Sequence, residues 1–158
     1  MVNKIKPEIL YFDPALKSYF KKLNHEWLDK YFFVTKADDK ILSDPEKIIR
    51  DGGCVIFAQF GKEIVGTCAL IKVTADEYEV AKMAVTEKAQ GNGVGYCLLQ
   101  AMIEEAKKRK ARIISLETAE QLKAAKALYK KSGFLQATGE RTHPDFGRKT
   151  FRMELKLT

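Results

Sequence analysis

The sequence has few of the residues that build disulfide frameworks and metal centres. It contains three cysteines, Cys54, Cys68 and Cys97, an odd number without CxxC spacing, which predicts neither a disulfide scaffold nor a zinc site. Each cysteine stands in an apolar stretch, so we expect all three to be small buried side chains. The two histidines, His25 and His143, are isolated from one another, and we therefore expect no histidine-based metal centre.

Long apolar segments are also missing. No apolar run approaches the ~20 residues that span a bilayer. The first residues, MVNK, lead into charged and proline-containing sequence rather than into the apolar core of a signal peptide. We therefore expect a cytoplasmic protein that does not contact a membrane.

The composition is that of an ordinary globular protein. Of the 158 residues, 46% are hydrophobic and 31% are charged, which predicts a single domain over residues 1–158 with a sizeable core. The formal charge of +7 suits nucleic acid or a polyanionic cofactor. No basic stretch is interleaved with aromatics, however, so we expect mostly solvated lysines and no nucleic-acid partner. A homodimer is left open.

The stretch that organises the chain is MAVTEKAQGNGVGYCLL, residues 83–99. It begins as a strand, passes through closely spaced glycines and continues as a helix. The first N–H groups of a helix have no partner within the helix, and glycines let an anion approach them. No acidic residue occurs from Lys88 through Ile103, so the positive end of the helix dipole is left for a ligand. The pattern indicates an anion site, although glycines also serve simply as turns and caps.

Two common phosphate loops do not fit this stretch. A P-loop needs Gly-Lys-Ser/Thr, whereas Val94 and Gly95 follow Gly93. The dinucleotide fingerprint GxGxxG, read from Gly91, requires glycine at position 96, where Tyr96 stands. Neither a nucleoside triphosphate nor a nicotinamide cofactor is therefore expected.

Two motifs together resemble those of a known family. Gln90-x-x-Gly93-x-Gly95, which follows a strand ending at Val85, is similar to the acetyl-CoA signature of the GNAT superfamily of N-acetyltransferases. Ala125-x-x-Leu128-Tyr129-x-x-x-Gly133-Phe134 resembles the second signature of that family. The resemblance runs from Glu79 to Phe134. The family often carries Asn three residues before the alanine, where this chain has Leu122, with Gln121 beside it.

The resemblance implies a site for acetyl-CoA, the acyl donor. The pyrophosphate would bind the N–H groups of the glycine loop, the pantetheine amides would pair with the backbone of the preceding strand, and Gln121 stands near the pantetheine arm. The implied donor-binding residues are Met83, Ala84, Val85, Gln90, Gly91, Asn92, Gly93, Val94, Gly95, Tyr96 and Gln121. No metal is implied.

Acetyl transfer to an amine requires a base and an acid. Glu79 is a charged residue in an otherwise apolar strand, where some members of the family place a catalytic glutamate, and it is the candidate base. An ordinary strand-end carboxylate is the alternative. At ~3.3 Å per residue Glu79 lies ~13 Å from Met83, so water could relay the proton. Tyr129 occupies the tyrosine of the second signature and is the candidate acid, with simple packing as its alternative.

The expected activity is transfer of an acetyl group from acetyl-CoA to a primary amine by direct attack. In GNAT-like folds the segment between the first two helices borders the acceptor site, which makes Tyr31, Phe32 and Phe33 candidate acceptor contacts, with core packing as the alternative. Nothing distinguishes a small amine, an amino acid, a polyamine or a protein as acceptor. A non-catalytic module that binds or senses acyl-CoA is the alternative function.

The expected fold is mixed α+β, GNAT-like, with six to seven mostly antiparallel strands, about four helices and a splayed parallel pair. Helices are predicted after Asp13-Pro14, after Asp44-Pro45, over 95–110 and after a capping box, Thr118-x-x-Gln121. Alternation in the strand over 78–85 would place Glu79, Ala81, Met83 and Val85 on one face unless a bulge intervenes. The predicted strands cover residues 7–12, 54–60, 64–73, 78–85, 112–117, 134–139 and 150–157.

Overall fold

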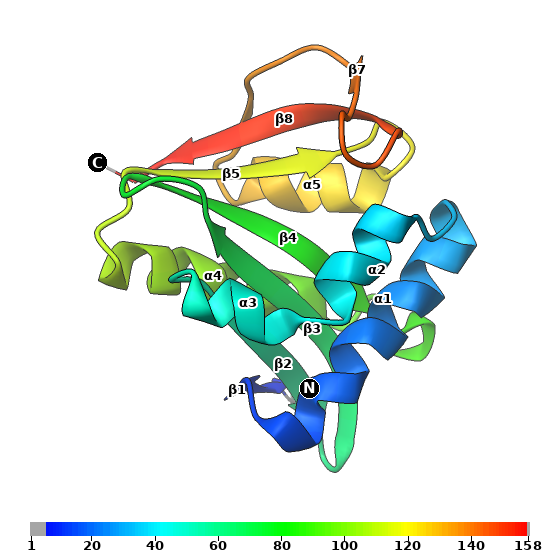
Figure 1. Cartoon of the computed structure of the whole chain (residues 1–158). Helices are drawn as coiled ribbons and strands as arrows, with labels where there is room; N and C mark the ends of the chain where they lie inside the picture. The colour runs from blue at the N-terminus through cyan, green and yellow to red at the C-terminus, as the bar shows by residue number, and fades with distance from the viewer. Residues whose placement is uncertain (1–5, 158) are drawn as a thin grey trace, which may run out of the picture.

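The chain folds as a mixed sheet with helices on both faces (Figure 1). The computed structural model describes residues 6–157, and within them it contains eight strands and five α-helices. The strands are β1 (Glu8–Tyr11), β2 (Cys54–Phe60), β3 (Glu63–Lys72), β4 (Glu77–Val85), β5 (Ile113–Thr118), β6 (Leu135–Gln136), β7 (Arg141–Thr142) and β8 (Lys149–Lys156). The helices are α1 (Lys17–Tyr31), α2 (Lys36–Leu42), α3 (Pro45–Arg50), α4 (Val94–Lys108) and α5 (Lys123–Lys131).

The strand order is β1-β2-β3-β4-β5-β8-β6, and β7 pairs with β8. All neighbours are antiparallel except β4 and β5, which are parallel. The predicted fold class is therefore confirmed, including its parallel pair. The structure has one strand more than the expected seven, because β6 and β7 are separate strands of two residues each.

The parallel pair is the feature that positions the site. Only three residue pairs join β4 to β5, from Glu77–Ile113 to Glu79–Ser115. Beyond Glu79 the two strands diverge, as the green and yellow ribbons show in Figure 1. The rest of β4, as far as Val85, therefore borders an opening in the middle of the sheet.

A separate hydrophobic core covers each face of the sheet. On one face α1, α2 and α3 contribute Phe20, Leu28, Leu42 and Ile48. On the other face, the buried side of α4 includes Leu98, Leu99, Met102, Ile103 and Ala106. This apolar stripe, at helical spacing, fixes α4 against the sheet. The start of α4 is thereby held beside the opening.

A β-bulge interrupts β4, so the simple alternation predicted for that strand is wrong. Ala81 pairs with Ala69 and Ala84 with Thr67. Two residues of β4, Lys82 and Met83, thus oppose one residue of β3, and Lys82 has a φ of +53°. An extra residue shifts all later side chains to the opposite face. Glu79 and Met83 therefore do not share one continuous face.

The helices between β1 and β2 include one that the sequence did not predict. Asp13 caps the 3₁₀ turn before α1 through a hydrogen bond from the N–H of Ala15 at 2.8 Å, and α3 begins at Pro45 as expected. Between them lies α2, which starts with a capping box made by Thr35 and Asp38. This box places the Asp38 side chain in the protein interior.

The predicted capping box at Thr118 is wrong. Thr118 is the last residue of β5, where it pairs with Phe151, and its buried hydroxyl has no partner in residues 6–157. The helix α5 begins only at Lys123. Gly133, with a φ of +98°, follows α5 as expected of a helix-ending glycine.

The three cysteines differ in how deeply they are buried. Cys54 and Cys68 are buried, as expected, whereas Cys97 is only half-buried because its position on α4 lies beside the buried stripe. Within residues 6–157, no helix has the length and apolar character of a membrane span.

Gly66 allows α4 to pack closely on β3. A Cβ atom at this position would lie 2.9 Å from Val94 Cγ1 and 3.0 Å from Leu98 Cδ1, two buried side chains of α4. We expect Gly66→Ala to lower the free energy of unfolding by about 1–3 kcal/mol through overpacking. Denaturant titration measures the change, with Gly139→Ala as control because a Cβ atom there meets no neighbour. Equal stability of the two variants would contradict this packing constraint.

Candidate active site

The loop between β4 and α4 forms one wall of the site. Gly91 and Gly93 have φ angles of +83° and +78°, the left-handed region that glycine adopts readily. Gly93 is the N-cap of α4, with no side-chain cap and no acidic residue in the first turn. Gln90 Nε2 donates to the carbonyl of Val85 at 3.2 Å, and Asn92 Nδ2 donates to the carbonyl of Ala89 at 3.2 Å. These bonds fix the loop and leave the helix end for an anion.

A cavity of about 640 Å³ extends from this loop into the opening between β4 and β5. Its volume lies within the ~300–1,000 Å³ usual for ligand sites. The lining includes nine of the eleven predicted donor-binding residues: Met83, Val85, Gln90, Gly91, Gly93, Val94, Gly95, Tyr96 and Gln121. Ala84 is buried outside the lining. Asn92 also lies outside it and shapes the loop instead. We call this space the donor cavity.

Tyr129 reaches the donor cavity from α5. Its ring packs edge-on against Phe134, with 6.0 Å between the ring centroids. Burial raises the pKa of the phenol far above its usual value. The hydroxyl makes no hydrogen bond within residues 6–157. Tyr129 therefore stays protonated at neutral pH and can donate to a group in the donor cavity.

A second cavity, of about 230 Å³, adjoins the first. Both are lined by Val80, Ala81 and Lys82, so one stretch of β4 forms a wall of each. The aromatic lining of the smaller cavity comes from Trp27, Phe32 and Phe146, and its acidic lining from Glu79, Glu117 and Asp145. We call this space the acceptor cavity, because Phe32, one of the predicted acceptor contacts, lines it.

Glu79 is a carboxylate of the acceptor cavity whose pKa is raised well above its usual value. Burial, together with the negative charge of Glu117, raises the pKa of Glu79 to about 7. Its carboxylate makes no hydrogen bond or ion pair within the described part of the chain. A carboxylate with such a pKa can accept a proton near neutral pH.

Glu117 is held in place by two partners. Its Oε1 pairs with Arg141 Nη2 at 2.6 Å, and its Oε2 accepts a hydrogen bond from Thr150 Oγ1 at 2.9 Å. The register of β5 explains its position near Glu79, since Ser115 lies opposite Glu79 and Glu117 follows two residues later. Sequence reasoning did not single out Glu117, because its proximity to Glu79 depends on strand pairing.

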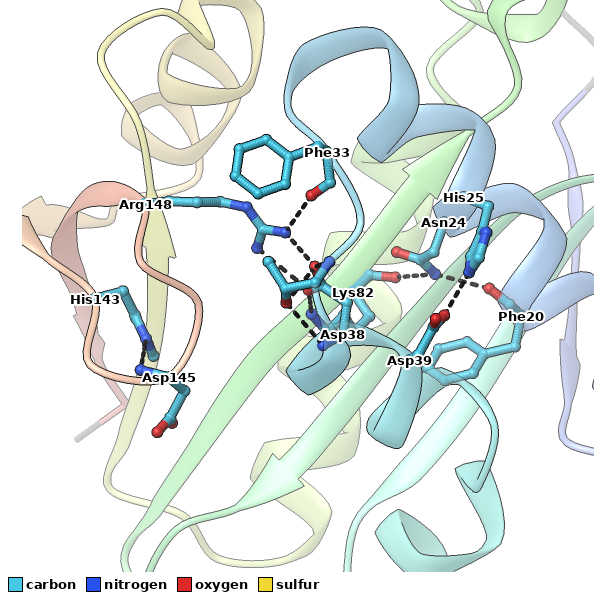
Figure 2. A network of polar contacts seen from close by, with 11 residues as sticks. Phe20, Asn24, His25, Phe33, Asp38, Asp39, Lys82, His143, Asp145 and Arg148 are labelled. Carbon is cyan, nitrogen blue, oxygen red and sulfur yellow. Dashed lines mark hydrogen bonds and ion pairs between the residues drawn. The ribbon is translucent and has the colours of Figure 1, made fainter.

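A buried ionic cluster forms another wall of the acceptor cavity (Figure 2). Asp38 of α2 is fully buried and pairs with Lys82 of β4 and with Arg148 of the β7–β8 loop. Burial alone would raise the pKa of Asp38, but hydrogen bonds from Arg148 and Lys82 outweigh it and hold the pKa well below its usual value. The cluster thus joins three segments that are remote in the sequence.

The three predicted acceptor contacts have different surroundings. Tyr31 lines the donor cavity, and Phe32 lines the acceptor cavity. Phe33 is 71% exposed and lines neither of these cavities, while its carbonyl oxygen accepts a hydrogen bond from Arg148 at 3.1 Å (Figure 2). Trp27 packs against Tyr31 and Phe32 and lines both cavities.

The structure also bears on the expectation about metal binding. Among the residues it describes, no group of three or more histidine, cysteine, aspartate or glutamate side chains could hold a metal ion. His143 lies on the acceptor cavity, where its Nδ1 accepts a hydrogen bond from the backbone N–H of Asp145 at 3.1 Å.

A mixed sheet with a splayed parallel pair, and a glycine loop leading into that opening, defines the class of the protein. The model of the Acetyltransferase (GNAT) family matches residues 12–134. The chain therefore belongs to this family.

Two curated relatives and two solved structures illustrate the similarity. The chain is 35% identical over 99 residues to the uncharacterized N-acetyltransferase YvbK of Bacillus subtilis (60% of this chain, 63% of that protein). It is 36% identical over 75 residues to the [ribosomal protein bS18]-alanine N-acetyltransferase of Escherichia coli K12 (48% of this chain, 51% of that protein). The chain thus matches only about half to two thirds of these relatives' length.

The solved structures match almost the whole fold. A GNAT-family acetyltransferase of Staphylococcus aureus Mu50 has a TM-score of 0.85 at 19% identity, covering 96% of this chain and 99% of that one. The yncA protein of Salmonella typhimurium, solved with its cofactor acetyl-CoA, has a TM-score of 0.80 at 21% identity, covering 98% of this chain and 95% of that one. At these identities the likeness shows a shared fold.

Proposed function

We propose that the protein transfers an acetyl group from acetyl-CoA to a primary amine by direct attack. The observation that carries this proposal is the junction of the two cavities. The donor cavity has an uncapped helix end for a diphosphate. It adjoins a second cavity that contains an unpartnered carboxylate with a pKa of about 7. Membership of the family and the names of the relatives support the same activity.

The lining of the donor cavity offers groups that could bind acetyl-CoA. The N–H groups at the start of α4 would bind the pyrophosphate, since they are backbone donors at the positive end of the helix. The edge of β4 from Met83 to Val85, which β5 does not pair, would hydrogen-bond the pantetheine amides. A backbone N–H near Met83 or Ala84 would stabilise the oxyanion of the thioester.

The residues of the site would handle the protons of the reaction. A free alkyl amine has a pKa of ~10.4 and is mostly protonated at neutral pH, so Glu79 would accept its proton directly or through water. The amine nitrogen then attacks the thioester carbonyl, forming the C–N bond as the C–S bond breaks. The departing thiolate, with a pKa of ~8.5, would receive a hydrogen bond or a proton from Tyr129. The second proton that the nitrogen loses balances the proton gained by the thiol.

The experiment that tests this proposal measures binding and turnover separately. We expect calorimetry to detect CoA binding, and a thiol-release assay with acetyl-CoA to detect turnover with at least one member of a panel of primary amines. Binding without turnover for all of the amines would favour the alternative, a non-catalytic module that binds acyl-CoA. No heat of binding with CoA would contradict both.

Tyr129→Phe should separate binding from chemistry. We expect CoA affinity to change less than about twofold, because the ring remains in place, and kcat to fall by about 100-fold, because the variant lacks the donor for the thiolate. Calorimetry and steady-state thiol release measure the two effects. Tyr78→Phe is the matched control, since Tyr78 is a buried tyrosine that lines neither described cavity. An unchanged kcat in Tyr129→Phe would remove this residue from the mechanism.

A further inference from the structure

The buried ionic cluster influences which amine can bind in the acceptor cavity. We propose that the acceptor is a small primary amine without a carboxylate beside its amino group, and that Asp38 determines this specificity by occupying the cationic side chains of the cavity. The inference rests on the proposed function, because it concerns the acceptor of that reaction.

The two cations that line the acceptor cavity, Lys82 and Arg148, are already paired. Lys82 Nζ lies 2.8 Å from Asp38 Oδ1. Arg148 forms a forked contact with both oxygens of Asp38, its Nη1 lying 3.2 Å from Oδ1. The side chains of Lys82 and Arg148 are only 11% and 12% exposed, and Asp38 is fully buried. One carboxylate of the protein thus occupies the position that the carboxylate of an amino acid would need.

Aromatic rings cover the same two cations. Lys82 Nζ lies 4.1 Å from the centroid of the Phe146 ring. The Arg148 guanidinium lies 5.2 Å from the Phe146 centroid and 5.3 Å from that of Phe32. Arg148 Nε is also buried and has no partner in residues 6–157. It is therefore shielded from solvent in this structure.

Around the acceptor cavity four carboxylates, Asp38, Glu79, Glu117 and Asp145, outnumber the three cations Lys82, Arg148 and Arg141. Glu79 has no partner within residues 6–157, and its carboxylate faces the acceptor cavity together with Glu117. Asp145 also lines the cavity and forms no ion pair within the described residues. An ammonium is attracted to this lining, whereas a carboxylate next to the reacting amine would be repelled by Glu79 and Asp145, which form no ion pair within residues 6–157.

The size of the cavity favours a small acceptor. Its volume of about 230 Å³ lies below the range of ~300–1,000 Å³ usual for ligand sites. The cation–π and ionic contacts of Arg148 hold the β7–β8 loop against α2 at its edge (Figure 2). The aromatic and aliphatic lining of the acceptor cavity suits a short apolar molecule that carries one ammonium group.

The experiment compares amines that differ only in the carboxylate. The wild-type protein is assayed for thiol release with 2-phenylethylamine against phenylalanine, and with pentylamine against norleucine. We expect kcat/KM to be at least about 100-fold higher for the amine of each pair, the effect of an unbalanced like charge. Phenylalaninamide separates charge from size, because it is as large as phenylalanine but lacks the negative charge. We expect its kcat/KM to lie within about tenfold of that for 2-phenylethylamine.

Asp38→Asn tests the assigned role of this residue. Without the negative charge, Lys82 and Arg148 can pair with a ligand carboxylate, so the preference for the amine over the amino acid should fall by at least about tenfold. CoA affinity serves as the readout of intact structure. Asp39→Asn is the matched control, because Asp39 stands on the same helix, pairs with His25 at 2.7 Å and lines neither of the two cavities. The control should keep the wild-type preference.

Each outcome decides one point. Equal or faster turnover of the amino acids by the wild-type protein overturns the inference, even where Asp38→Asn does not fold. Rejection of phenylalaninamide as strong as that of phenylalanine overturns it too, because size would then explain the selectivity. Faster turnover of an Ala-Ala-Ala peptide than of either small amine overturns the assignment of a small acceptor. Absence of both CoA binding and turnover contradicts the proposed function itself.

Discussion

Gly93→Glu is expected to abolish CoA binding. Gly93 has a φ of +78° and caps the start of α4, so a glutamate strains the backbone and places a negative charge where the diphosphate would bind. We expect calorimetry to show at least about a 1,000-fold loss of affinity, with acetyl transfer lost in parallel. Gly93→Ala, which adds the strain without the charge, should have a smaller effect.

Gly61→Glu is the matched control for this prediction. Gly61 also has a positive φ, +57°, and a Cβ atom there meets no neighbour. It lies in the turn between β2 and β3, outside the donor cavity. We expect this variant to bind CoA as the wild-type protein does. Retained affinity in Gly93→Glu would show that the helix end does not hold the diphosphate.

Glu79→Gln is expected to lower kcat/KM by about 100- to 1,000-fold, the usual contribution of a general base. It should also change the pH profile. A base acts when deprotonated, and the pKa of Glu79 is raised to about 7. The wild-type kcat/KM should therefore rise as the pH passes upward through about 7. This rise near pH 7 is one limb of the pH profile, and it should be absent from the variant. The kcat/KM of the variant should rise only where the amine itself loses its proton.

Glu77→Gln is the control, since Glu77 stands on the same strand but outside both cavities. It pairs with Arg152 at 3.0 Å, and this pairing lowers the pKa of Glu77. The limb near pH 7 should therefore persist in this variant. If Glu79→Gln kept the limb as well, another group would have to be the base, and Glu79 would be an ordinary strand carboxylate.

Much of the fold could be predicted because its signals are local. The buried stripe of α4 follows helical spacing, and β2 has the predicted bounds, Cys54–Phe60. The helix α2 was missed because seven residues with only two large apolar side chains show little periodicity. Its capping box at Thr35 and Asp38 was the available signal. The box predicted at Thr118 failed because pairing with Phe151 keeps that residue in a strand.

The donor loop and the acceptor cavity also differ in how far they could be predicted from the sequence. The donor loop is one continuous segment, so its glycines could be recognised from spacing alone. The acceptor cavity combines residues far apart in the chain: Asp38 meets Lys82, 44 positions away, and Arg148, 110 positions away. No local pattern encodes such contacts. The bulge at Lys82, which directs that side chain toward Asp38, depends on the register with β3.

The short pairing of β4 with β5 has a consequence for solubility. A strand edge whose N–H and C=O groups are unpaired can form hydrogen bonds with a strand of another chain. Such edges usually lie at the rim of a sheet. Here the edge runs through the interior of the sheet, from Val80 to Val85, where α4, α5 and β5 flank it and keep foreign strands out. The backbone groups that we propose to bind the pantetheine arm are thereby shielded from pairing with another chain.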